Sequence, residues 1–207
     1  MNNRHYPVPA APVRTTIVVR GSRFIAQVIP TATVTAAREA IAAARAEMPD
    51  ATHHCYAYLI GYGTSTIAGM SDDGEPAGTA GRPILSVLRG ADLGDTTVIV
   101  TRYFGGTLLG VGRLARAYSE AASAALAIVP RTQRVIYQRM IIRLPYTDYA
   151  GVRRLLAEAA AAIVAETFTT EVEITADIPV DRIHDLGQRL GESSAGRAQM
   201  VPATNMV

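Results

Sequence analysis

The chain of 207 residues contains no lysine and no tryptophan, and Cys55 is its only cysteine. A single cysteine excludes an intrachain disulfide and a zinc site built from several cysteines. No run of residues approaches the roughly 18 to 20 apolar positions of a membrane-spanning helix. The first residues also lack the apolar core of a secretory signal. We therefore expect a cytoplasmic protein with no membrane partner.

Charged residues are scarce as well, at 18% of the chain with a formal net charge of +2. So small a net charge does not by itself predict binding to nucleic acid. Because lysine is absent, every basic side chain apart from histidine is an arginine, whose planar guanidinium group suits phosphate recognition. The alanine-rich composition offers codon bias as a second explanation, so the arginines alone do not define a function.

Apolar residues make up 49% of the chain, which is typical of a globular protein. The pattern changes near Pro130, and we predict two α+β domains, residues 1–130 and 131–207. In the first, residues 1–13 form an extended arm. A hairpin follows over 14–29, and Thr33 caps a helix that ends before Pro49. Further strands are expected over 52–60, up to residue 70 and over 97–103, with helices over 79–88 and from Arg113.

The second half alternates between apolar and polar residues over 134–144 and 168–178, as strands with one buried face do. Thr147 is a predicted helix cap, and Phe168 is expected to face the core with Val172. A second helix begins after Pro179, and short strands near 163–165 and 198–201 complete the order β-α-β-β-α-β. This is the ferredoxin-like split βαβ arrangement.

A glycine-rich motif follows the strand at 97–103. Glycines supply positive φ or close backbone approach, and a helix N-terminus after such a loop attracts anions. Arginines within and near the motif would add charged donors. An alternative is a tight turn in which the glycines only let the helix pack on the sheet. The predicted anion site contains Arg102, Gly105, Gly106, Gly110, Gly112, Arg113, Arg116 and Arg82.

An acidic loop contains Asp72, Asp73 and Glu75. Carboxylates on one loop can hold Mg²⁺ together with substrate phosphate oxygens, or act as an acid and base pair. Otherwise the Asp-Asp-Gly sequence makes a turn whose side chains cap nearby N–H groups. No metal ligand is predicted beyond this candidate Mg²⁺ loop.

The segment His53-His54-Cys55 is expected on a strand, where only His53 and Cys55 share a face. Three interpretations stay open for it. These are a metal site completed by distant residues, a cysteine nucleophile with a distant base, and a buried polar strand face.

Three motifs together resemble the YigZ/IMPACT family: Ser22–Ala26, Ser71–Ile84 and Arg102–Tyr118. The His53-His54-Cys55 segment matches it too. The resemblance is strong over residues 14–128 and weaker afterwards. It implies an N-terminal fold like the second domain of a small-subunit ribosomal protein and a C-terminal domain like one in elongation factor G. Arg116 stands where the family pattern has lysine, so the charge is kept but an amine nucleophile is not.

The resemblance implies a role in translation, because eukaryotic relatives regulate it. Our leading hypothesis is a non-enzymatic, translation-associated regulatory protein that binds RNA or the ribosome through the arginine and glycine-loop surface. The alternative is a Mg²⁺-dependent, phosphate-handling enzyme that uses the Asp72-Asp73-Glu75 loop. A third hypothesis is a protein-docking module in residues 131–207, which predicts an exposed apolar patch there.

Overall fold

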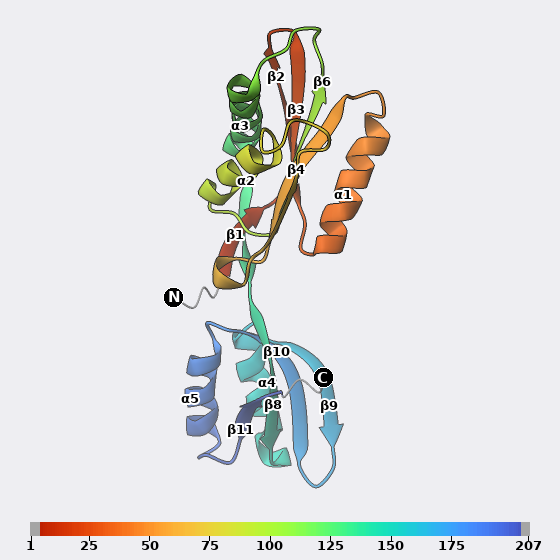
Figure 1. Ribbon diagram of the computed structural model, residues 1–207. Coiled ribbons are helices and arrows are strands. Elements are labelled where there is room, and N and C mark those ends of the chain that lie inside the picture. Colours follow the sequence, from red (N-terminus) through yellow and green to blue (C-terminus); the bar gives the residue numbers. More distant parts are fainter. Residues whose placement is uncertain (1–4, 204–207) are drawn as a thin grey trace. The chain divides into compact units, whose positions relative to one another are not determined.

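The computed structural model describes residues 5–203 and is mixed α/β throughout (Figure 1). The chain forms two compact units. The N-terminal unit comprises Tyr6–Arg134. The C-terminal unit begins at Val135 and includes His5. Each unit has its own hydrophobic core.

The N-terminal unit is built around a five-stranded antiparallel sheet with the order β2-β3-β6-β4-β5. In chain order its elements are β1 (His5–Pro9), β2 (Val13–Val19), β3 (Ser22–Pro30), α1 (Val34–Glu47), β4 (His53–Ile60), the short 3-10 helix η1 (Gly63–Ser65), β5 (Ile67–Ser71), α2 (Gly81–Gly90), β6 (Thr96–Tyr103), α3 (Val111–Ile128) and β7 (Arg131–Val135).

The predicted hairpin and the first helix are present. Strands β2 and β3 are joined by Arg20 and Gly21, which both have positive φ, the conformation that a tight two-residue hairpin turn requires. Helix α1 begins after Thr33, whose hydroxyl accepts a hydrogen bond from the N–H of Ala36 at 3.1 Å. That contact satisfies one of the backbone donors left unpaired at a helix start.

Helices cover both faces of this sheet (Figure 1). Helices α2 and α3 pack on the face that carries Val98 and Val100 of β6, and the main core lies between them. Helix α1 packs on the opposite face, where Ile99 contacts Ile41 and Ala44. The alternation along β6 explains its continuous burial, because each face meets a different helix layer. The alanines of α3 keep it close to the sheet.

A separate two-stranded sheet pairs β1 with β7. The extended arm predicted over residues 1–13 therefore contains a strand, and residues 1–4 of that prediction lie outside the described residues. Asp95 holds this region together, since its buried carboxylate accepts hydrogen bonds from the Tyr6 hydroxyl and the Gly61 N–H, each at 2.8 Å. Arg134 pairs with the same carboxylate at 2.9 Å.

The C-terminal unit has the predicted β-α-β-β-α-β order and a four-stranded antiparallel sheet arranged β11-β8-β10-β9. The ferredoxin-like prediction is confirmed in this order of strands and helices. Its elements are β8 (Tyr137–Leu144), the 3-10 helix η2 (Tyr146–Asp148), α4 (Tyr149–Glu158), β9 (Ala162–Phe168), β10 (Val172–Pro179), α5 (Ile183–Ser193) and β11 (Gln199–Pro202).

One local prediction in this unit is wrong, and a second holds only in part. Thr147 does not cap α4, because Tyr146–Asp148 forms a 3-10 turn and Asp148 takes the N-cap position without a side-chain cap bond. Phe168 ends the edge strand β9 directly opposite Val172, so it lies on the same face of the sheet and contacts Tyr149 of α4. It is nevertheless 52% exposed and is not buried with Val172. The apolar and polar alternation in the sequence continues through a turn at residues 169–171, which separates the two strands.

Candidate functional site

Strand pairing brings two of the sequence motifs together. Strands β4 and β6 run antiparallel, with His53 opposite Arg102 and Cys55 opposite Val100. Cys55 faces the core beneath α2 and α3, as Val100 does. His54 points to the other face, where its Nδ1 lies 3.1 Å from the Thr101 hydroxyl. Burial lowers the pKa of His54 below its ordinary value. The strand geometry thus separates the two histidines.

The Asp72 side chain caps backbone N–H groups at the start of α2 and in the loop before it. Its carboxylate accepts hydrogen bonds from the N–H groups of Gly78, Ala80 and Gly81 at 2.8, 2.9 and 2.8 Å. Although burial raises the pKa of Asp72, these backbone donors outweigh that effect and hold the pKa below its usual range. Asp72 therefore makes the capping contacts that the turn interpretation predicts.

Asp73 is also fully engaged. One carboxylate oxygen accepts a hydrogen bond from the His54 N–H at 2.6 Å, and the other pairs with Arg45. Asp72 and Asp73 therefore both use their carboxylates in contacts within the protein. Among residues 5–203, no group of three or more His, Cys, Asp or Glu side chains is arranged to hold a metal ion.

Glu75 differs from its two neighbours because its side chain is only 4% exposed. Its Oε1 accepts hydrogen bonds from Nη1 of Arg102 at 2.7 Å and from the hydroxyl of Tyr118 at 2.6 Å. Its Oε2 lies 3.7 Å from Nε2 of His53. The acidic loop, the histidine segment and both ends of the glycine motif therefore meet at one carboxylate.

The structure corrects the predicted role of Arg102. The sequence predicts this residue on an exposed anion surface, but it is 5% exposed and paired with Glu75. It lies at the end of β6 with its guanidinium beneath the acidic loop. A second nitrogen, Nη2, reaches the Ser22 hydroxyl at 3.3 Å. Its charge is already balanced inside the protein. We therefore assign it to a group of contacting residues that we call the Glu75 cluster: His53, Cys55, Glu75, Arg102 and Tyr118.

Tyr118 and Cys55 complete the cluster. The Cys55 sulfur lies 3.3 Å from the Tyr118 hydroxyl and 3.0 Å from the Asp72 carbonyl oxygen. Burial raises the pKa of the Cys55 thiol to about 12 and also raises the pKa of Tyr118. A thiol that stays protonated is a poor nucleophile, so the geometry favours the buried-polar interpretation of Cys55.

A cavity of about 460 Å³ opens above the Glu75 cluster. Its floor contains His53, Glu75 and Arg102, and its walls are largely apolar. The sequence did not predict this cavity or the part that Tyr118 plays beneath it. The remaining lining residues come from the loop and helix start after β6 and from two short segments: Thr52, Gly74, Pro76, Phe104, Leu108, Leu109, Gly110, Val111 and Leu114.

The four predicted loop glycines have different roles. A Cβ on Gly105 would lie 1.9 Å from the carbonyl carbon of Gly21, so Gly105 permits a close approach to the β2–β3 turn. Gly106 and Gly110 have positive φ, and Gly110 is the N-cap of α3. Gly112 has neither feature, since a Cβ added to it would meet no atom within 4 Å. The prediction that Gly112 is needed for backbone shape is wrong.

The other predicted arginines are exposed. Arg113 and Arg116 lie in the first two turns of α3, and neither pairs with a carboxylate in the described part of the chain. Arg82 is exposed in the first turn of α2, where its charge helps lower the pKa of Asp72. These three residues therefore form a group distinct from the buried Arg102.

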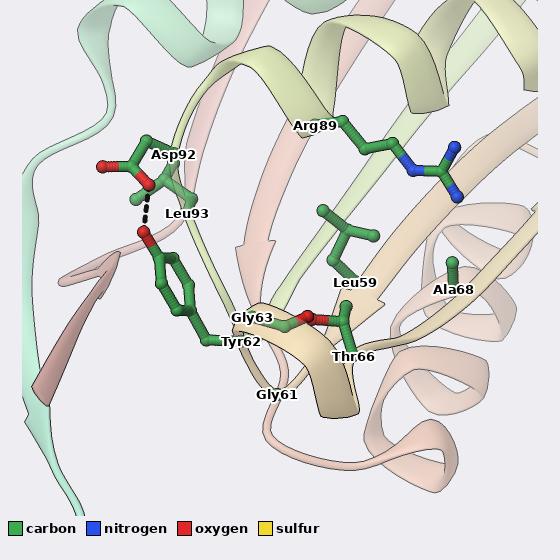
Figure 2. A pocket seen from close by; sticks show the side chains of 9 residues that line it. All are labelled: Leu59, Gly61, Tyr62, Gly63, Thr66, Ala68, Arg89, Asp92 and Leu93. Carbon is green, nitrogen blue, oxygen red and sulfur yellow. Dashed lines mark hydrogen bonds between the residues drawn. The ribbon is translucent and has the colours of Figure 1, made fainter. Parts of the chain in front are cut away.

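A second cavity, of about 450 Å³, lies at the other end of β4 (Figure 2). It contains none of the predicted site residues. The Tyr62 hydroxyl donates a hydrogen bond to Asp92 across it, and Arg89 of α2 extends past Leu59 away from that pair. Arg89 is the one cation among the nine lining residues.

No helix within residues 5–203 combines the length and the apolar character needed to cross a membrane. Comparison with protein families matches residues 20–126 to the Impact N-terminal domain. Residues 142–197 match a domain of unknown function, DUF1949. The first match spans all the residues of the Glu75 cluster.

Relatives of similar length were also found. The IMPACT family member YigZ of Escherichia coli (strain K12) is 35% identical over 94% of this chain and 96% of its own. An IMPACT family member of Haemophilus influenzae is 36% identical over 93% of this chain and 94% of its own length. YvyE of Bacillus subtilis (strain 168) is 33% identical over 89% of this chain and 84% of its own length. A crystal structure of a hypothetical protein matches with a TM-score of 0.78, 33% identity and 98% coverage of both chains. With a matching N-terminal domain and relatives of this identity and coverage, the chain belongs to the IMPACT family.

Proposed function

We propose that this protein is a translation-associated regulator that binds RNA or the ribosome through exposed arginines at the start of α3. The observation that carries the proposal is the state of Arg113 and Arg116, which are exposed and pair with no carboxylate within residues 5–203. They adjoin the N-terminus of an 18-residue helix whose N-cap, Gly110, provides no side-chain hydrogen bond. Arg82 belongs to the same proposed surface.

The distribution of charge supports this location. Residues 6–134 carry twelve arginines and nine acidic residues, a formal charge of +3, whereas residues 135–207 carry seven arginines and nine acidic residues, a charge of −2. All seven arginines of the latter segment are ion-paired: Arg139, Arg143, Arg153, Arg154, Arg182, Arg189 and Arg197. Unpaired guanidinium groups are thus concentrated in the N-terminal unit.

The chemistry suits a phosphate backbone. An exposed guanidinium without a protein carboxylate offers its fork of donors to a phosphate, and free N–H groups at a helix N-terminus add to the attraction. Phosphate contacts position a protein on RNA without reading its sequence. We therefore expect binding that depends on backbone charge and on RNA shape.

The test is co-sedimentation with ribosomes across a salt series. Wild type should bind more weakly as salt increases, because each phosphate contact releases counterions. The double substitution Arg113→Gln and Arg116→Gln should reduce the slope of log affinity against log salt by about two. The matched control is Arg38→Gln with Arg154→Gln, which removes the same charge from α1 and α4.

Two results would overturn the proposal. The first is wild-type protein that fails to sediment with ribosomes at low salt. The second is an Arg113 and Arg116 variant whose salt slope equals that of the Arg38 and Arg154 control. A reduced slope in the first variant alone would place the RNA contact at the start of α3.

A further inference from the structure

The buried carboxylate of Glu75 has one oxygen that the protein does not use. Its Oε1 receives two hydrogen bonds, from Arg102 and Tyr118. Its Oε2 receives none within residues 5–203, and the nearest polar partner recorded for it is His53 Nε2 at 3.7 Å, beyond hydrogen-bond distance. Both residues line the cavity above the cluster. The Glu75 side chain as a whole is only 4% exposed, so a carboxylate oxygen without a partner there favours a hydrogen-bond donor.

The histidine beside it presents a second acceptor. His53 Nδ1 lies 2.8 Å from the carbonyl oxygen of Asp73. A carbonyl oxygen only accepts, so Nδ1 must carry the hydrogen of this bond. In the neutral ring, Nε2 is then the atom with the lone pair, and it lies 3.7 Å from Glu75 Oε2. Two acceptors 3.7 Å apart therefore converge on one place.

The walls above these acceptors are apolar and accessible. Leu109 and Leu114 are buried, whereas Phe104, Leu108 and Val111 form a rim that is 46%, 85% and 65% exposed. A cavity of about 460 Å³ accommodates a small organic group. The Phe104 ring adds a face that attracts cations, and it already lies 5.5 Å from the Arg102 guanidinium carbon.

We propose that this cavity binds a primary ammonium group carried on a short apolar stem. The ammonium donates hydrogen bonds to Glu75 Oε2 and His53 Nε2, and its stem lies against Phe104, Leu108 and Leu114. Arg102 bonds to the opposite oxygen of Glu75, which leaves the lone pairs of Oε2 to accept hydrogen bonds from the ligand. The proposal is independent of the RNA-binding surface.

The required group has two sources, a small free amine or the side chain of a lysine in a peptide. The chain itself contains no lysine, so a side chain from a second copy cannot supply it. The two sources are distinguished by probes. Benzylamine represents the small amine, and Nα-acetyl-lysine methylamide represents the peptide side chain.

The experiment is an NMR titration of the full chain with labelled leucine and valine methyl groups. Benzylamine, benzyl alcohol and benzoate share an aromatic stem and differ in the head group. We expect benzylamine to shift the methyl signals of Leu108, Leu109, Val111 and Leu114 saturably and to bind at least about tenfold more tightly than benzoate. Methyl signals of control positions in the C-terminal unit, such as Leu155 and Leu186, should stay in place.

Two variants test which residues of the cavity contact the ligand. Glu75→Gln keeps the size of the side chain and should lower benzylamine affinity about tenfold while leaving benzyl alcohol affinity nearly unchanged. Because Glu75→Gln also disturbs Arg102, Leu108→Ser provides a variant at an exposed site that cannot affect the core. It should weaken both aromatic probes alike.

Equal binding of benzoate and benzylamine would overturn the proposal, as would methyl shifts outside the cavity or an unchanged amine preference in Glu75→Gln. Absence of any saturable shift with benzylamine and with the lysine derivative would also overturn it. Binding of the lysine derivative at least as tight as that of benzylamine would identify a peptide side chain as the source. Tighter binding of benzylamine would identify a small amine.

Discussion

The hydroxyl of Tyr118 donates a hydrogen bond of 2.6 Å to Glu75, although 43 positions separate the two residues in the sequence. Helix α3 supplies the tyrosine and the loop before α2 supplies the carboxylate. The same carboxylate oxygen also holds Arg102 at the end of β6. One buried acceptor thus connects a helix, a loop and a strand, and its removal should affect all three.

Removal of Glu75 should be far more damaging than removal of its tyrosine partner. Tyr118→Phe deletes one hydrogen bond and should lower the free energy of unfolding by about 1 kcal/mol. Glu75→Ala leaves the buried Arg102 charge unpaired and should cost about 3–5 kcal/mol. Urea unfolding measures both values. The control is Glu47→Gln, which breaks an exposed pair with Arg14 and should leave the midpoint nearly unchanged.

Substitution by alanine at two glycines of the loop motif should change the stability of the protein in opposite directions. Gly105→Ala places a methyl group against the Gly21 backbone and should destabilise the N-terminal unit by more than about 2 kcal/mol. Gly112→Ala meets open space inside α3 and should stabilise the protein by up to about 1 kcal/mol through helix propensity. Thermal unfolding compares them. Equal losses in both variants would contradict the assigned contacts.

Asp72 should make stability depend on pH in acid. Its pKa is lowered in the folded state, so the stability it contributes is complete above the ordinary aspartate pKa and is lost as pH falls through the folded-state value. Below about pH 4, Asp72→Asn should therefore flatten the decline in unfolding free energy. Asp185→Asn on the exposed side of α5 is the control and should keep the wild-type slope.

Cys55 should resist alkylation while the protein is folded. At pH 8, a thiol with a pKa of about 12 exists almost entirely in the protonated form, and Cys55 is also fully buried. Iodoacetamide should label it in urea far faster than in buffer, as mass spectrometry would show. Rapid labelling of the native protein would contradict this and would revive the nucleophile hypothesis for the His53-His54-Cys55 segment.

Local patterns were sufficient to predict many of the elements. The turn at Gly21, the Thr33 cap and the alternation of β10 each depend on neighbours in the sequence, and each is present. Thr147 and Phe168 show where such patterns fail. A 3-10 turn takes Thr147 out of the cap position, and Phe168 stays half exposed because it ends the edge strand β9. Neither feature leaves a strong signature in composition.

The sequence motifs that supply the candidate site could be predicted, but the contacts between their side chains could not. The motifs that supply His53, Glu75 and Arg102 were all recognised, but their roles depend on the register of β4 against β6 and on which way each carboxylate turns. Asp72 and Glu75 are three positions apart, yet one caps backbone N–H groups and the other forms a buried ion pair. Tyr118 could have been suspected, since it is the one hydroxyl-bearing residue on the apolar stripe of α3.

The pairing of β1 with β7 has a consequence for the order in which the chain folds during its own synthesis. Strand β1 ends at Pro9, and its partner begins only at Arg131. At about 5–20 residues per second, the ribosome needs roughly 6 to 25 seconds to make the intervening segment. During that interval β1 has no partner strand, whereas β2 and β3 have both been synthesised and can pair with each other. Strand β1 is therefore among the last parts of the N-terminal unit to become fixed.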